Sequence, residues 1–178
     1  MTIVSDNVTV RPALERETPL VLQFVRELAE YEHLEDQVVA SEEGLSKALF
    51  GPRPYAEVVF VCVDAQPVGF ALFFHNFSTF LGRPGLYLED LFVRPEFRGR
   101  GCGRRALQWL AGLAVERGCG RLEWAVLDWN APSIGFYRSL GAVPLDEWTV
   151  FRLTGPALEA LARAHPPSQA SAVERRRD

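Results

Sequence analysis

Hydrophobic residues recur along the chain with two different periods. Strand-like segments, in which they alternate or run together, cover residues 7–12, 56–63, 68–76, 86–93, 121–127 and 148–154. Helix-like segments show a period of three to four residues or typical helix-start residues. They cover residues 18–31, 41–50, 101–117, 130–141 and 155–164. The segment 79–85, which contains glycine and proline, is expected to be a loop. The pattern therefore predicts an α/β protein.

The order of these segments predicts a mixed sheet. Residues 64–67 join two apolar runs into a hairpin, which implies an antiparallel pair. The succession of strand, helix and strand over residues 86–127 implies a crossover connection, and therefore at least one parallel pair. No change of composition interrupts the chain before its last dozen residues. We expect one domain over residues 1–165, followed by a disordered tail at residues 166–178.

Composition narrows the class of protein. The chain has 178 residues, 48% of them hydrophobic and 24% charged, which suits a soluble domain with a proper core. A net charge of -4 disfavours binding to nucleic acid. No apolar run approaches the roughly 20 residues of a membrane helix, and the first residues lack the basic start of a signal peptide. We therefore expect a cytoplasmic protein that binds neither nucleic acid nor a membrane.

The cysteines and histidines give no sign of a metal site or of a disulfide framework. The three cysteines are odd in number and lack the C-x-x-C spacing of zinc ligands. The three histidines are scattered along the sequence. We expect no bound metal and a reducing compartment. The residues concerned are Cys62, Cys102, Cys119, His33, His75 and His165.

One loop carries the candidate chemistry. Residues 98–103 read RGRGCG and stand between a predicted strand and a predicted helix. Glycines at such a junction let the backbone approach a ligand, and free N–H groups together with the helix dipole favour a phosphate. The surrounding arginines suit a small anion better than a duplex. They are Arg94, Arg98, Arg100, Arg104 and Arg105.

Three phosphate-binding patterns can be compared with this loop. The dinucleotide pattern G-x-G-x-x-G follows an early strand, whereas this loop reads G-x-G-x-G and lies past the middle of the chain. A nucleoside triphosphate loop needs a lysine, and the only lysine is Lys47. Arg98, Gly101 and Gly103 satisfy the third pattern, Q/R-x-x-G-x-G/A, which is that of the acetyl-CoA pyrophosphate loop of the GNAT acetyltransferases. For the hexapeptide alone, a glycine-rich turn without a ligand is the alternative.

Three longer stretches carry a closer resemblance. They are LAEYEHLEDQV at 28–38, YLEDLFVRPEFRGRGCG at 87–103 and AVLDWNAPSIGFYRSLGA at 125–142. In order and spacing they resemble the spermidine/spermine and thialysine N-acetyltransferases of the GNAT superfamily, over roughly residues 8–161. The resemblance implies the GNAT fold, an α/β fold with a central, curved, mixed sheet of six to seven strands and helices on both faces.

The resemblance also implies acetyl-CoA as the acyl donor. Backbone N–H groups of the glycine loop would hold its pyrophosphate, and the side chains of Arg98 and Arg104 either add a charged contact or are merely solvated. The strand before the loop would splay from its neighbour and bind the pantetheine arm, and one of its N–H groups would polarise the thioester carbonyl. Asn130 matches a contact to that arm and also suits a helix N-cap. The implied donor-binding residues are Leu91, Phe92, Val93, Arg98, Gly99, Arg100, Gly101, Cys102, Gly103, Arg104, Asn130 and Ser133.

Two residues match the acid and the base of the family. Tyr137 matches the general acid, because a phenol with a pKa of about 10 can return a proton to a departing thiolate. Its alternative role is packing between helix and sheet. Glu89 matches an acidic residue beside the substrate amine, where it would accept a proton through water. Asp90 is expected on the opposite face of the strand and is the less favoured base.

The resemblance further implies an acidic, partly aromatic groove for a long cation. The alternative for Glu32 is a solvated helix end. The sequence departs from the family at residues 143–150 (VPLDEWTV), where an acidic loop is shorter, and this leaves the length of the acceptor open. The implied substrate-binding residues are Tyr31, Glu32, Glu89, Glu123, Trp124 and Ala125.

These features predict a cytoplasmic, homodimeric, acetyl-CoA-dependent N-acetyltransferase. The expected acceptor is a primary amine of a small cationic molecule, either a polyamine or a thialysine- or lysine-like amine. Two alternatives stay open. One is a GNAT enzyme for another acceptor, such as an aminoglycoside, an amino acid or a peptide, and the other is a CoA-binding module without turnover.

Overall fold

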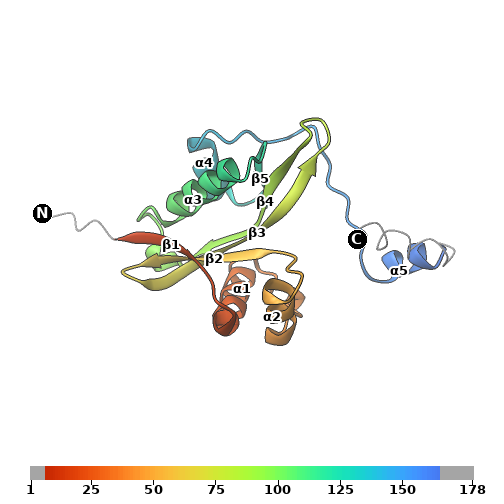
Figure 1. The fold of residues 1–178 in the computed structure, drawn as a ribbon, viewed down its shortest axis with the longest axis horizontal. Helices are drawn as coiled ribbons and strands as arrows, with labels where there is room; N and C mark the ends of the chain where they lie inside the picture. The colour runs from red at the N-terminus through yellow and green to blue at the C-terminus, as the bar shows by residue number, and fades with distance from the viewer. Residues whose placement is uncertain (1–6, 165–178) are drawn as a thin grey trace, which may run out of the picture. The chain divides into compact units, whose positions relative to one another are not determined.

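The structure is a computed structural model that describes residues 7–164 (Figure 1). The chain forms two compact units, Met1–Leu127 and Asp128–Asp178. The tail expected from residue 166 onward lies outside the described residues.

The first unit is built on a five-stranded sheet with the strand order β1-β2-β3-β4-β5. The first four strands pair antiparallel, and β4 pairs with β5 in parallel. The parallel pair predicted from the strand–helix–strand succession is therefore confirmed. The strands are β1 (Val8–Pro12), β2 (Glu57–Val63), β3 (Gln66–Ser78), β4 (Arg83–Val93) and β5 (Leu122–Trp124).

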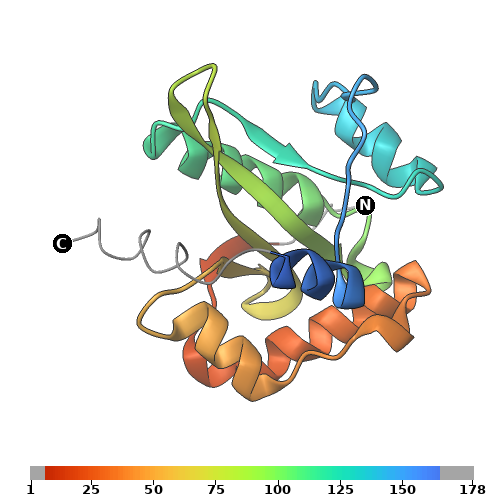
Figure 2. The same cartoon turned by 90° about the vertical axis from the view of Figure 1, so that its right-hand side faces the viewer.

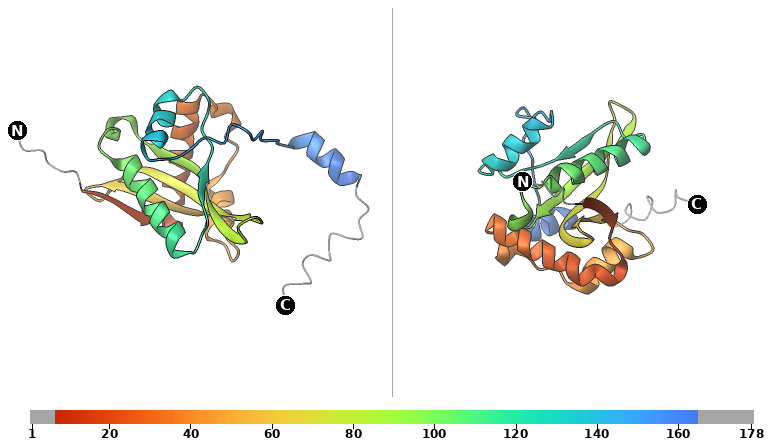
Figure 3. Two further views of the ribbon diagram at one scale, coloured as in Figure 1. Left: turned by 90° about the horizontal axis from the view of Figure 1, so that it is seen from above. Right: turned by 90° about the vertical axis from the view of Figure 1, so that its left-hand side faces the viewer.

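Helices cover both faces of this sheet. The helices α1 (Thr18–Glu32) and α2 (Glu42–Phe50) lie on one face and α3 (Cys102–Glu116) lies on the other, as Figures 2 and 3 show. Each of these helices agrees with its predicted range to within one residue at either end. Short 3-10 turns occupy Glu15–Glu17, Glu35–Gln37 and Pro95–Phe97.

The face of the sheet under α1 holds an aromatic core. Phe24 of α1 has no exposed surface, and its ring centroid lies 5.8 Å from those of Phe60 and Phe70 and 6.4 Å from that of Phe92. Buried aromatic contacts of this kind fix a helix against a sheet. The core on the α3 face is mainly aliphatic, and its buried members are Val61, Val63, Val68, Val93, Cys102 and Ala106.

The second unit contains two helices among its described residues, α4 (Ala131–Ser139) and α5 (Gly155–Arg163). Both agree with the sequence pattern. Gly141 follows α4 with a φ of 88°, a conformation that favours glycine and ends the helix there.

The sheet is smaller than the sequence predicts. It has five strands among the described residues instead of six to seven, because residues 148–154 form no strand. An alternating apolar segment becomes a strand only where a second strand supplies hydrogen-bond partners, and the pattern itself does not provide that partner. The strand predicted over 121–127 also ends early, at Trp124.

The hairpin of β3 and β4 is longer than the sequence predicts. The loop expected at residues 79–85 shrinks to a turn between Ser78 and Arg83, where β4 begins. Pro84 is thus part of the strand and pairs with Phe77. A proline is tolerated near the end of a strand, since it removes only one N–H from the ladder.

No helix among residues 7–164 is long and apolar enough to cross a membrane. In the same range, no three His, Cys, Asp or Glu side chains come close enough together to hold a metal ion.

Candidate active site

The parallel pairing of β4 with β5 covers only part of β4. Leu86–Leu88 pair with Leu122–Trp124, whereas β4 continues to Val93. From residue 89 to residue 93, the edge of β4 that faces away from β3 therefore has no strand beside it among the described residues. Such an open edge presents unpaired backbone N–H and C=O groups to a ligand.

The hydrogen-bond phase of β4 decides which residues face the open edge. The N–H of Arg94 donates to the carbonyl of Val68 at 3.0 Å, and Phe92 lies two residues back in the same register. Backbone groups of alternate residues face the same neighbour in an antiparallel pair. The backbone of Phe92 is therefore directed to β3, whereas that of Leu91 and Val93 is directed to the open edge.

A β-bulge lies at the start of the open edge. Leu72 pairs with Asp90 and Phe73 pairs with Leu88, so Glu89 is an extra residue without a partner on β3. Paired residues share a face of the sheet, and Leu72 packs against the core under α1. Asp90 therefore lies on the α1 face. The strict alternation that would place Glu89 and Asp90 on opposite faces does not hold across a bulge.

The pKa of Asp90, which lies at this bulge, is shifted from its ordinary value. Asp90 is half-buried, whereas Glu89 is exposed. Burial raises the pKa of Asp90 to about 7, with further contributions from the negative charges of Glu89 and Glu32. Burial also raises the pKa of Glu32. The three carboxylates are close enough to interact, and Asp90 joins Glu89 as a candidate proton acceptor.

The glycine loop leads from the open edge into α3. Gly99 and Gly101 have φ angles of 77° and 85°, in the left-handed region that favours glycine. Apart from the adjoining residues of the chain, no atom lies within 4 Å of the position that a Cβ would take on Gly99 or Gly101. Gly101 is the N-cap of α3 and offers no side chain to the first N–H groups of that helix. Open space, permissive backbone and a helix N-terminus together fit a diphosphate.

Two arginines between β4 and α3 reach back to α1. Arg94 donates to Glu27 from Nε and from Nη2, each at 2.8 Å. Arg98 donates from Nε to the carbonyl of Val93 at 2.9 Å, and its guanidinium carbon lies 4.3 Å from the ring centroid of Tyr31. Arg98 thus contacts both the open edge of β4 and a predicted substrate residue.

The predicted residues around β5 differ in their surroundings. Glu123 forms an ion pair with Arg121 at 2.8 Å and accepts a hydrogen bond from Nδ2 of Asn76 at 2.8 Å. Its charge is therefore already balanced. Trp124 ends the pairing with β4, and Ala125 follows it. These two residues lie where β4 and β5 cease to pair.

Asn130, Ser133 and Tyr137 belong to the second unit. The side-chain oxygen of Asn130 accepts a hydrogen bond from the N–H of Ser133 at 3.3 Å, so Asn130 is the N-cap of α4. Tyr137 is half-buried, and its ring centroid lies 5.4 Å from that of Phe136. Ser133 and Tyr137 are four residues apart and share one face of α4. The capping role of Asn130 is confirmed, and the roles toward a donor or an acceptor stay predictions.

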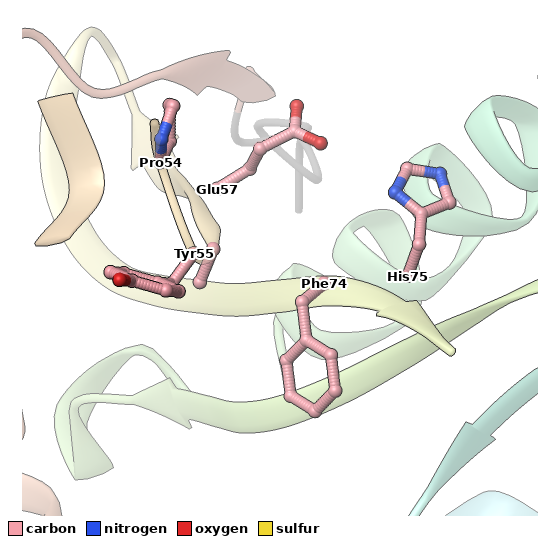
Figure 4. A pocket seen from close by; sticks show the side chains of 6 residues that line it. Pro54, Tyr55, Glu57, Phe74 and His75 are labelled. Atoms are coloured by element: carbon pink, nitrogen blue, oxygen red, sulfur yellow. The ribbon is translucent and has the colours of Figure 1, made fainter. Parts of the chain in front are cut away.

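A separate hollow lies beside the first residue of β2 and the middle of β3. Figure 4 shows the side chains of Glu57 and His75 on its wall. The Glu57 carboxylate is held by Arg117, whose hydrogen bond lowers the pKa of Glu57. None of the predicted site residues lines this hollow. Its lining residues are Pro54, Tyr55, Ala56, Glu57, Phe74 and His75.

Sequence reasoning missed the environment of Asp90 and the contacts of Arg94 and Arg98 with α1. A bulge leaves no trace in a period-two pattern, and contacts between distant segments leave none either. The sequence offered one signal, the two adjacent acids Glu89 and Asp90 inside an otherwise apolar strand. Burying a charge costs free energy unless the charge is paired, so acids in such a strand indicate a special environment.

Known proteins share these features. The sequence profile of the acetyltransferase (GNAT) family matches residues 21–142. Thialysine N-epsilon-acetyltransferase of Bos taurus is 40% identical, in an alignment that covers 87% of this chain and 97% of that protein. L-ornithine N5-acetyltransferase NATA1 of Arabidopsis thaliana is 31% identical, in an alignment that covers 85% of this chain and 86% of that protein.

A solved structure shares the fold. The integron cassette protein VCH_CASS6 of V. cholerae is similar with a TM-score of 0.74 and 28% identity, over 88% of this chain and 98% of that chain. The open strand edge, the glycine loop and these similarities define an acyltransferase, and the chain belongs to the acetyltransferase (GNAT) family. It is an N-acetyltransferase of the branch that holds the thialysine enzymes and the spermidine/spermine-like proteins.

Proposed function

We propose that this chain transfers the acetyl group of acetyl-CoA to a primary amine of a small cationic acceptor, either a polyamine or a thialysine-, ornithine- or lysine-like amine. The observation that carries the proposal is the 40% identity to a thialysine N-epsilon-acetyltransferase along 97% of that protein. The interacting carboxylates of Glu32, Glu89 and Asp90 support it, because an acidic region attracts an alkylammonium.

The donor is proposed to lie along the open edge of β4. The N–H groups of Leu91 and Val93 would donate to carbonyl oxygens of the pantetheine arm, and one of them would polarise the thioester carbonyl. The backbone of residues 99–104 would hold the pyrophosphate. The exposed side chains of Arg100 and Arg104 are suited to add positive charge there. Asn130 and Ser133 remain proposed contacts to the pantetheine arm.

Acetyl transfer requires two proton movements. The acceptor ammonium must lose a proton before its nitrogen can attack the thioester carbonyl, and the departing thiolate must gain one. We assign the first movement to Glu89 acting through water, with Asp90 beside it, and the second to the phenol of Tyr137. Tyr31, Trp124 and Ala125 would line the acceptor site. Glu123 would contribute to the acceptor site indirectly, by positioning Arg121 and Asn76, since Arg121 balances its charge.

Three further features are proposed from the resemblance. The catalytic domain spans residues 1–165, the enzyme is cytoplasmic, and it acts as a homodimer. Exposed apolar side chains near the turn between β3 and β4 support association with a second copy. Phe77 is 60% exposed, Phe80 is 96% exposed and Leu81 is 54% exposed, and such clusters commonly mark an interface.

The proposal is tested by the release of CoA from acetyl-CoA in the presence of single amines. The panel contains spermidine, spermine, putrescine, thialysine, ornithine, lysine, an aminoglycoside and a short peptide. We expect turnover with at least one of the first six amines. Turnover with the aminoglycoside or the peptide alone would replace the acceptor class. Tight binding of acetyl-CoA without turnover by any amine would favour the CoA-binding module.

A further inference from the structure

We propose that Arg98 is a positioning residue that joins the acceptor side of the site to its donor side, and that it is not a ligand of the pyrophosphate. The inference deepens the proposed function and rests on it for the catalytic part. Arg98 makes two contacts, a hydrogen bond to the Val93 carbonyl and a cation–π contact with the Tyr31 ring.

The first contact changes what the open edge offers to a ligand. The carbonyl of Val93 faces this edge, where no strand of the described part of the chain supplies a donor, and Nε of Arg98 donates to it at 2.9 Å. The edge then presents the N–H of Val93 and both backbone groups of Leu91. An extended amide chain that lies along the edge can accept from the N–H of Val93, whereas a donor to the Val93 carbonyl would have to share that oxygen with Arg98. Arg98 thereby selects one register of the donor's pantetheine arm.

The second contact fixes a side chain on the acceptor side. The Arg98 guanidinium lies 4.3 Å from the ring centroid of Tyr31 and 5.8 Å from that of Phe92. Cation–π contacts at these distances are attractive and hold the ring in one orientation. Tyr31 lies in the last turn of α1, next to Glu32. The position of Tyr31 therefore depends on the same arginine that occupies the β4 edge.

A neighbouring ion pair holds α1 against the end of β4 without any contribution from Arg98. Arg94 and Arg98 flank the turn Pro95–Phe97, and their partners Glu27 and Tyr31 lie four residues apart on one face of α1. Arg94 forms a two-pronged ion pair with Glu27, which fixes α1 to the end of β4. Arg98 then contacts the C-terminal end of α1, where it positions the Tyr31 side chain.

The geometry favours the positioning role of Arg98 over the phosphate role. Its Nε is bonded to the Val93 carbonyl, and its guanidinium carbon lies over the Tyr31 ring. These two contacts fix the direction of the side chain, and only Nη1 and Nη2 are left for a diphosphate at residues 99–104. Arg104, at the start of α3, is exposed and makes neither of these contacts. It serves as the comparison residue for the phosphate role.

The test compares two donors, acetyl-CoA and acetylpantetheine, since the second lacks the pyrophosphate. In Arg98→Lys the charge is kept but the planar fork is lost. We expect kcat/KM to fall by about tenfold with both donors and the KM of the amine to rise. For Arg104→Ala we expect kcat/KM to fall with acetyl-CoA and to stay unchanged with acetylpantetheine. A loss in Arg98→Lys that is confined to acetyl-CoA, or no loss at all, would overturn the proposal.

A second measurement does not depend on turnover. The unfolding equilibrium of the ligand-free protein is measured for Arg98→Lys, Tyr31→Leu and the double variant. We expect a coupling between the two changes of about two- to fivefold in the unfolding equilibrium constant. Additive effects would overturn the contact-based argument. If no amine of the panel is acetylated but the coupling is present, the proposed function fails while the link between Arg98 and Tyr31 stands.

Discussion

At the scale of single residues, the bulge in β4 places the two neighbouring acids Glu89 and Asp90 in different environments. Glu89 is exposed and has no partner on β3, whereas Asp90 is half-buried on the α1 face. Burial and the nearby charges of Glu89 and Glu32 raise the pKa of Asp90 to about 7. The bulge thus holds one half-buried acid, Asp90, near the pH at which it exchanges protons.

Asp90→Asn should change the pH dependence of stability. The pKa of Asp90 in the folded protein lies above its ordinary value of 3.8. Asp90 therefore destabilises the folded protein increasingly as the pH rises from about 4 to about 7, because folding then requires a charged, half-buried carboxylate at this position. At pH 8 the variant should be more stable than wild type by on the order of 1 to 3 kcal/mol, and near pH 4 the two should be alike.

Urea unfolding at the two pH values measures this difference. Asp64→Asn, the same change at an exposed position in the turn between β2 and β3, is the matched control for the loss of a carboxylate. An equal difference between Asp90→Asn and wild type at both pH values would contradict the prediction.

Tyr137→Phe should separate chemistry from binding. Removal of the phenol proton should lower turnover by roughly 10²-fold if Tyr137 protonates the departing thiolate, while the affinity for acetyl-CoA stays nearly unchanged. Turnover is followed by CoA release and affinity by calorimetric titration. Tyr55→Phe, at a side chain outside the proposed site that is 83% exposed, is the control. Unaltered turnover in Tyr137→Phe would remove the assigned role.

At the scale of elements, the first strand and the first helix are joined by an ion pair. Glu17 precedes α1 and accepts from Arg11 of β1 at 2.8 Å and 2.7 Å, and from the N–H of Leu14 at 2.9 Å. The hydrogen bond from Arg11 is the main reason why the pKa of Glu17 falls to about 2. The pair closes the corner through which the chain leaves the sheet and enters α1.

Glu17→Gln should weaken this corner in a pH-dependent way. A carboxylate whose pKa is depressed on folding contributes stability above its ordinary pKa of 4.5, and that contribution is lost as the pH falls toward 2. Since the Arg11 side chain is 39% exposed, solvent reduces the effect to about 1 kcal/mol at pH 7. The difference from wild type should shrink at pH 2.5.

Thermal unfolding at the two pH values checks this expectation. Glu30→Gln, on the exposed face of α1, controls for the removal of an acidic side chain from the same region. A loss of stability that persists undiminished at pH 2.5 would show that the carboxylate charge is not its cause.

At the scale of the whole molecule, the open edge of β4 and the glycine loop lie in the first unit, and the proposed acid Tyr137 lies in the second. The exposed apolar side chains at the β3–β4 turn belong to the first unit as well. Burial of such a cluster against a second copy would remove apolar surface from water.

Sedimentation should therefore report a particle of about twice the chain mass of 19.9 kDa. Phe80→Asp should shift the particle toward the mass of one chain, because a charge in an apolar interface must be desolvated. Sedimentation of the wild-type protein as a single chain at micromolar concentration would contradict the homodimer.

The sequence by itself determined most of the secondary structure and the class of chemistry. Helical periods located α1 and α3 to within one residue, because each of these helices has one buried face and that face dictates the spacing of its apolar residues. The helix-start residues at 41–43 located α2 to within one residue. The glycines of the loop could be recognised for a similar reason. Positive φ angles at Gly99 and Gly101 favour glycine at those positions.

The tertiary structure alone decided how far the strands pair and which charges meet. Within residues 7–164, the segment 148–154 has the pattern of a strand but no partner strand, and the edge of β4 has no neighbouring strand from residue 89 onward. The bulge at Glu89, the pKa of Asp90 and the contact between Arg98 and Tyr31 all depend on segments that are distant in the sequence. A periodic pattern shows on which face of its own helix or strand a residue lies. Strand pairing and electrostatic interactions depend instead on which other element lies opposite that face.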